Sequence, residues 1–128
     1  MEPLVWQEEW SVGNESLDRD HKRLVEIINS ISETSESSED AIRLLDDLRD
    51  YTEMHFGKEE RMMEAAQIPG FVEHAKHHRL FIAWLDSMQT VIRSPKTHAI
   101  IFDAVNNFLR NWLEAHILTS DMQYKGKL

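Results

Sequence analysis

Histidine and carboxylate residues at helical spacing stand on both sides of a Pro-Gly turn between His55 and His78. His55 and Glu59 are four residues apart, and so are His74 and His78, so each pair shares one face if its segment is helical. Imidazole and carboxylate suit a borderline divalent metal such as iron, manganese or zinc, and the chain has no cysteine for a thiolate site. Helices joined by a short turn lie antiparallel, so both pairs are predicted to face one interior.

Four helices are predicted to position these residues, because apolar residues recur at helical spacing and no alternating strand pattern is present. The predicted helices span residues 17–34, 39–66, 71–93 and 96–120. Residues 1–16 show no sustained period and are expected to form an extended arm whose Trp6 and Trp10 pack onto the helices. The sequence therefore predicts one all-α domain over residues 1–128, an up-down-up-down antiparallel four-helix bundle.

The other helices add further candidate ligands. His21 falls on the apolar face of the first helix and His116 on that of the fourth, and Asp121 follows near the end. Five histidines and two carboxylates exceed what one metal uses, whereas two metals that share bridging carboxylates employ such a set naturally. If both carboxylates bridge, the histidines divide unevenly and one metal keeps an open position. The predicted metal ligands are His21, His55, Glu59, His74, His78, His116 and Asp121.

The spacing of His116 and Asp121 does not fit a regular helix. Five residues at about 100° each place the two side chains about 140° apart, and Ser120 would align with His116 instead. The sequence therefore predicts a π-type turn, or a helix end near Ser120, that returns Asp121 to the cluster.

A core without metal is the alternative interpretation. A single histidine on an apolar face is more often a core residue than a ligand, but burying the whole set without metal leaves several groups unpaired, at about 1–3 kcal/mol each. His77 and His98 are expected to face solvent, and Glu60 to belong to the charged outer face. The combination favours a metal cluster.

The net charge of −9 argues against nucleic acid and anionic membranes as partners. No run of about 18 apolar residues is present, and the first residues lack the pattern of a signal peptide. With no cysteine for disulfides, the cytoplasm is the expected location, and a monomer is the default expectation.

The chain resembles the hemerythrin family, in particular its single-domain bacterial members. The resemblance covers nearly the whole chain and rests on four motifs: LDRDHKRL, HFGKEE, HAKHH and WLEAHILTSD. It implies a non-haem di-iron centre with two Fe ions per chain, bridged by Glu59, Asp121 and a solvent-derived oxo or hydroxo group. It further implies that one iron is held by His74, His78 and His116, and that the other, held by His21 and His55, is open to O2.

The family's W-L-x-x-H-I pattern makes Trp112, Leu113 and Ile117 candidates for the wall of an O2 pocket, with plain bundle core as the alternative. The function implied is reversible binding of molecular oxygen by a carrier, storage or delivery protein that is not an enzyme, with an oxygen-consuming enzyme as its candidate client. The alternatives are a di-iron oxidase or peroxidase, and a sensor of O2, NO or iron acting through a separate partner. Zinc or manganese in place of iron is the inorganic alternative. The five-to-two excess of histidine disfavours oxygenase chemistry, because ferritin-like oxygen-activating sites are rich in carboxylates.

Overall fold

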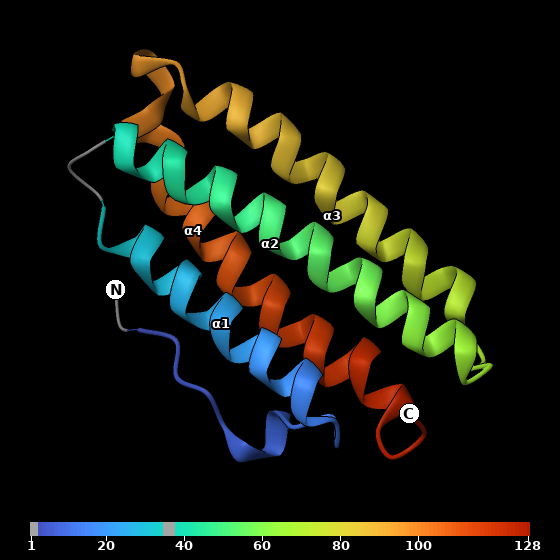
Figure 1. The fold of residues 1–128 in the computed structure, drawn as a ribbon. Coiled ribbons are helices and arrows are strands. Elements are labelled where there is room, and N and C mark those ends of the chain that lie inside the picture. The colour runs from blue at the N-terminus through green and yellow to red at the C-terminus, as the bar shows by residue number, and fades with distance from the viewer. Residues whose placement is uncertain (1–2, 35–37) are drawn as a thin grey trace.

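Four long helices run antiparallel in up-down-up-down order in the computed structural model (Figure 1). The structure describes residues 3–34 and 38–128, and the side chains of residues 38 and 95–100 lie outside this description. The helices are α1 (Glu15–Ser32), α2 (Ser38–Ala65), α3 (Phe71–Ile92) and α4 (Pro95–Ala115). α1 packs against α2 and α4, and α3 packs against the same two helices. The predicted all-α four-helix bundle is therefore confirmed.

The helix boundaries follow local backbone chemistry. α1 begins two residues before the predicted start, because the side-chain oxygen of Asn14 caps it by accepting from the backbone N–H of Leu17 at 3.1 Å. After α2, the N–H of Ile68 donates to the carbonyl of Met63 at 3.0 Å, and Gly70 adopts a φ of 84° that glycine tolerates best. Pro95 opens α4, where its missing N–H removes no helical hydrogen bond.

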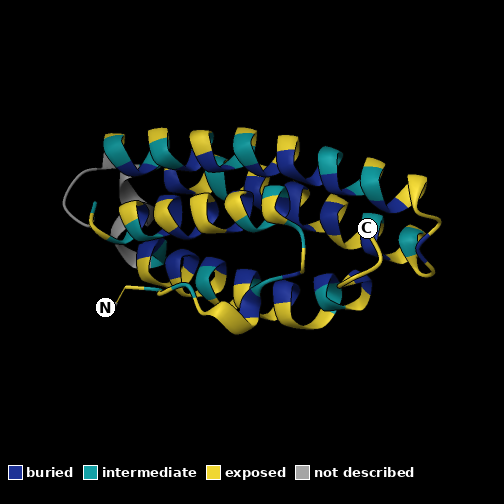
Figure 2. Ribbon diagram, turned by 60° about the horizontal axis from the view of Figure 1, so that its bottom comes forward, coloured by how far each residue is buried: buried dark blue, intermediate teal, exposed yellow. Residues whose placement is uncertain are grey.

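Buried residues line the inner faces of all four helices (Figure 2). Met63 and Leu109 take inward positions, whereas their neighbours Met62 and Phe108 are less buried. Phe108 is 39% exposed, whereas Leu109 is fully buried. None of the helices in the part of the chain that the structure describes is long and apolar enough to cross a membrane.

The amino-terminal arm lies along the bundle. The backbone N–H of Leu4 donates to the Asn29 side-chain oxygen at 2.8 Å, and the Asn29 amide donates back to the Leu4 carbonyl at 2.8 Å. Trp10 is buried and meets Trp6 edge to face at 5.8 Å between ring centroids. The arm therefore packs as expected, although the short 3-10 helix η1 (Glu8–Trp10) interrupts its extended backbone.

Candidate metal centre

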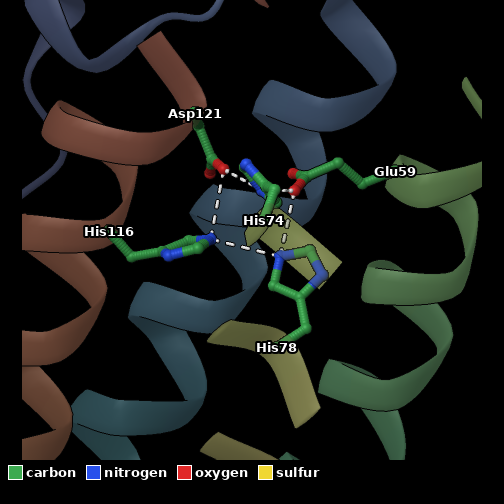
Figure 3. Close-up of side chains that lie close together, drawn as sticks. All are labelled: Glu59, His74, His78, His116 and Asp121. Atoms are coloured by element: carbon green, nitrogen blue, oxygen red, sulfur yellow. Dashed lines mark hydrogen bonds and ion pairs between the residues drawn. The ribbon is translucent and has the colours of Figure 1, made fainter. Parts of the chain in front are cut away.

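All seven predicted ligands lie buried at the end of the bundle where α2 turns into α3 (Figure 1). Their ligand atoms form two groups, and within each group all atoms lie within 4.8 Å of one another. The larger group consists of Glu59, His74, His78, His116 and Asp121, which point toward one another from three sides in Figure 3. The smaller group consists of His21, His55 and Glu59. Glu59 belongs to both groups, so the two groups share a carboxylate.

A π-helix brings Asp121 to the cluster. The five residues after α4, His116–Ser120, form the π-helix η2, and the N–H of Asp121 donates to the carbonyls of His116 and Ile117. This wider turn accommodates one more residue than an α-turn, so Asp121 rather than Ser120 aligns with His116. The Asp121 Oδ1 atom lies 3.2 Å from His116 Nε2, and the residue is fully buried. The predicted π-type turn is therefore confirmed.

Each carboxylate directs one oxygen to each group. Glu59 Oε1 lies 2.6 Å from His74 Nε2, and Glu59 Oε2 lies 3.3 Å from His55 Nε2. Asp121 Oδ1 lies 3.1 Å from His74 Nε2, and Asp121 Oδ2 lies 3.2 Å from His21 Nε2. Two carboxylates that each face both groups are arranged as bridges between two cations.

Several of these buried atoms have no hydrogen-bond partner among the described residues. They are both ring nitrogens of His21 and both carboxylate oxygens of Asp121. His21 Nε2 approaches Asp121 Oδ2 at 3.2 Å, but the pair lacks hydrogen-bond geometry. Unpaired buried polar groups cost about 1–3 kcal/mol each, and nitrogen and oxygen donors together suit borderline divalent cations. The donor set therefore fits a pair of such metals.

In the metal-free cluster, protons on the histidines balance the negative charge of the carboxylates. Burial alone would lower the pKa of His21 and His74, but the adjacent carboxylates of Asp121 and Glu59 raise both to about 9. Burial would likewise raise the pKa of Glu59, yet the surrounding histidines hold it well below its usual range. Burial lowers the pKa of His78, which keeps this imidazole neutral. Metal binding must therefore displace protons from the cluster.

The metal-free protein is expected to lose stability as the pH rises from about 6.5 to about 9. In the folded protein the pKa of His21 and His74 is about 9, which exceeds the unfolded value. Their contribution to the stability of the folded state is therefore complete below the unfolded pKa and is lost as the pH rises through the folded pKa. Thermal unfolding across this pH range checks the prediction, with metal-loaded protein as the control, because there the metal replaces the protons. A flat profile for the metal-free protein would contradict it.

Two carboxylates that the sequence analysis did not assign to the site hold the outer nitrogens of ligand histidines. Asp20 Oδ2 lies 2.9 Å from His55 Nδ1, and Glu60 Oε2 lies 2.9 Å from His78 Nδ1. A carboxylate there keeps the proton on Nδ1 and presents Nε2 to the interior. The placement of Glu60 on the solvated outer face was wrong, because this contact draws the side chain inward to 21% exposure. The only sequence signal was that each residue adjoins a predicted ligand, His21 or Glu59.

Tyr124 is a further site residue that the sequence analysis missed. Its hydroxyl donates to Glu59 Oε2 at 2.9 Å from the 3-10 helix η3 (Asp121–Tyr124), and the residue is fully buried. Burial and the nearby carboxylates of Asp121 and Glu59 raise the tyrosine pKa, so the hydroxyl stays protonated and remains a donor. Regular helical periodicity ends at the π-helix, so no spacing in the sequence linked Tyr124 to the cluster. Tyr124 therefore orients a shared carboxylate.

Replacing Asp20 with asparagine is expected to weaken metal binding about 10- to 100-fold, the usual effect of losing such an outer partner. The Asp20 carboxylate also accepts from Lys58 Nζ at 2.6 Å, and although burial opposes ionisation, His55 and Lys58 hold its pKa at about 2. Asparagine keeps the shape but removes the charge that orients His55. Competition with a chelator measures the affinity, and Asp50→Asn, at an 80% exposed side chain, is the matched control. Equal affinities in the two variants would refute the role of Asp20.

A small apolar cavity of about 10 Å³ lies in the core, about one helical turn along the chain from the cluster histidines. Leu24 and Thr52 stand in its wall, and each lies three residues from a member of the smaller donor group, His21 and His55 respectively. The complete lining is Leu24, Ile28, Leu48, Thr52, Phe81, Leu109, Trp112 and Leu113. Of the predicted pocket residues, Trp112 and Leu113 line this cavity, whereas Ile117 is fully buried but lies outside its wall.

Two histidines, His77 and His98, were predicted to lie outside the cluster and to face solvent. His77 is exposed on α3, as expected. The expectation for His98 falls outside the described residues, because its side chain is not among them.

Trp112 stacks flat on His116, with ring centroids 4.5 Å apart and planes 9° from parallel. Aromatic packing thus fixes one side of the cluster.

Comparison with known proteins agrees with this geometry. Residues 12–128 match the family model described as the hemerythrin HHE cation binding domain. The chain is 34% identical to myohemerythrin-1 of Phascolopsis gouldii, covering 99% of this chain and 96% of that protein. It is 32% identical to bacteriohemerythrin of Pseudomonas aeruginosa (strain LESB58), covering 97% of this chain and 80% of that protein.

A third relative and a solved structure extend the comparison. Myohemerythrin of Riftia pachyptila is 35% identical, covering 98% of this chain and 94% of that protein. A crystal structure of a single-site mutant of hemerythrin has the same fold, with a TM-score of 0.84 at 23% identity, covering 100% of this chain and 98% of that one. The family model and these relatives span almost the whole sequence, so the chain belongs to the hemerythrin family of cation-binding, oxygen-binding proteins.

Proposed function

We propose that this protein binds dioxygen reversibly at a pair of irons. The proposed iron ligands are His21, His55, Glu59, His74, His78, His116 and Asp121. The observation that carries the proposal is that two buried carboxylates each face both donor groups. A ferrous pair supplies two electrons to dioxygen when the gas binds and recovers them when the gas leaves.

The division of the histidines locates the proposed gas site. Three histidines serve the larger group, whereas only His21 and His55 serve the smaller one, which therefore has room for an exogenous ligand. Leu24 and Thr52 in the wall of the cavity lie three residues from His21 and His55, the two histidines of this smaller group. Leu113 closes the cavity from α4, and its apolar wall excludes water, which slows proton transfer to bound oxygen and favours release over further reaction.

The outer residues keep the proposed ligands in place. Asp20 and Glu60 hold the protons on His55 Nδ1 and His78 Nδ1, which leaves Nε2 of each ring free to bind metal. The Tyr124 hydroxyl occupies one lone pair of Glu59 Oε2. These contacts reduce the reorganisation needed when metal binds.

Gas binding accounts for the site better than an oxidase or peroxidase function does. The cavity of about 10 Å³ is close to the smallest that holds one water molecule, so it excludes an organic substrate. The histidine-rich ligand set also differs from the carboxylate-rich sites that activate oxygen. We therefore propose a carrier, storage or delivery protein that is not an enzyme. The client enzyme, the monomeric state and the cytoplasmic location stay predictions.

Metal analysis combined with oxygen cycling tests the proposed function. Protein purified without added metal is expected to contain about two irons per chain. Its visible absorption should change on exposure to oxygen and return when oxygen is removed, through many cycles. Substoichiometric zinc would contradict iron as the metal, and rapid irreversible oxidation in air would contradict the carrier function.

A further inference from the structure

A surface hollow of about 350 Å³ between α3 and the end of α4 reaches one member of the metal cluster. It is lined by His77, Trp112, Ala115, His116, Thr119 and Ser120. His116 at this hollow is 7% exposed, the highest value among the seven cluster residues. The hollow is therefore a place where the outside of the protein meets a proposed ligand.

A metal ion needs such a place, because the cluster residues other than His116 and His74, which is 5% exposed, are enclosed. His21, His55, Glu59, His78 and Asp121 are each 1% exposed or less. An ion that arrived along their side of the cluster would have to pass through packed helices. The hollow is lined by His116 itself, so an ion held there lies against a residue of the cluster.

The lining of the hollow has the chemistry of a first binding point for a cation. His77 is exposed on α3, so its imidazole can take a metal ion from water. Thr119 and Ser120 add hydroxyl oxygens, and they belong to the π-helix η2. The net charge of −9 raises the local concentration of cations around the whole molecule.

We propose that this hollow is the port through which iron reaches the centre, with His77 as a transient ligand. The inference rests on the proposed function, since it takes iron as the resident metal. Ferrous iron first exchanges a water ligand for the His77 imidazole. His116 Nε2 then displaces that imidazole and draws the ion toward Glu59 and Asp121. No electron is transferred in these steps. The loaded metal centre does not contain His77, so loss of this side chain should change the rate of iron loading and leave the final iron content unchanged.

Loading kinetics of the metal-free protein test the port. Metal-free protein is mixed with about two equivalents of ferrous iron per chain without oxygen, and the amount of iron bound is followed with time. His77→Ala is expected to slow uptake about three- to tenfold, the effect of losing one weak ligand. His77→Glu should restore the rate, because a carboxylate also binds ferrous iron. Lys76→Ala is the matched control at the exposed neighbouring position, and it should not slow uptake.

A second pair of variants tests the path independently of His77. Ala115 is exposed in the wall of the hollow, and Ala115→Leu should narrow the hollow and slow uptake. Ala83→Leu makes the same change at an exposed position of α3 outside the wall and should leave the rate unchanged. Final iron content and reversible oxygen binding should be the same in all variants.

The outcomes separate the port from the proposed function. Wild-type rates in both His77→Ala and Ala115→Leu, with about two irons bound at the end, would overturn the port and leave the proposed function standing. A slow His77→Ala variant that glutamate does not rescue would overturn the transient ligand. A wild-type protein that takes up no iron would overturn the proposed function and the port together.

Discussion

Substitution of Glu59 by glutamine is expected to prevent the binding of two irons and to lower the unfolding temperature by about 10–20 °C. Glu59 is the residue that belongs to both donor groups, and it lies fully buried among four histidines. Glutamine keeps the volume but loses the negative charge and one acceptor oxygen, so neither group retains its full ligand set. Removing one partner from a buried charged cluster costs about 3–5 kcal/mol.

Metal analysis and thermal unfolding of the same preparation measure both effects. Glu64→Gln is the matched control, because Glu64 lies five residues further along the same helix with its side chain exposed. Surface changes of this kind stay within about 0.5 kcal/mol. Full iron content in Glu59→Gln would exclude Glu59 as a shared ligand, whereas equal losses in both variants would point to a general fault in loading.

Substitution of Leu113 by asparagine is expected to convert reversible oxygen binding into rapid oxidation. Leu113 is 4% exposed and lines the cavity, three residues before His116 in the chain. Asparagine places hydrogen-bonding atoms in an otherwise apolar wall, so water becomes stable there and can deliver protons to bound oxygen. A gain of about 1.4 kcal/mol for that water corresponds to about tenfold faster oxidation.

Leu113→Met is the matched control, since it keeps an apolar side chain of similar volume. The oxidation rate is read from the decay of the oxygenated spectrum, at a temperature well below the unfolding transition of each variant. Equal oxidation rates in the asparagine and methionine variants would contradict the hypothesis that the apolar wall slows oxidation by excluding water. Loss of reversible oxygen binding in the asparagine variant alone would support this hypothesis.

Much of the cluster could be predicted because its information is local in the sequence. Pairs such as His55 with Glu59 lie four residues apart, and helical geometry alone puts them on one face. The five-residue step from His116 to Asp121 also indicated the π-turn, because no regular helix aligns that spacing. These conclusions required only the backbone period of a helix.

The partners of the ligands were not predictable in this way. The contact of His78 with Glu60 joins residues 18 apart, that of His55 with Asp20 joins residues 35 apart, and that of Tyr124 with Glu59 joins residues 65 apart. Whether such side chains meet depends on how far each helix is rotated and shifted along its neighbour, which packing of the whole core determines.

The sequence by itself determined the four helices, the identity of the candidate metal donors and the side of each helix that carries them. Only the tertiary structure decided which carboxylate oxygen faces which group, which outer residues hold the histidines, and that His116 lies beneath a surface hollow. The physical reason is that helical periodicity acts over a few residues. The relative placement of helices results from the packing of side chains distant in the chain.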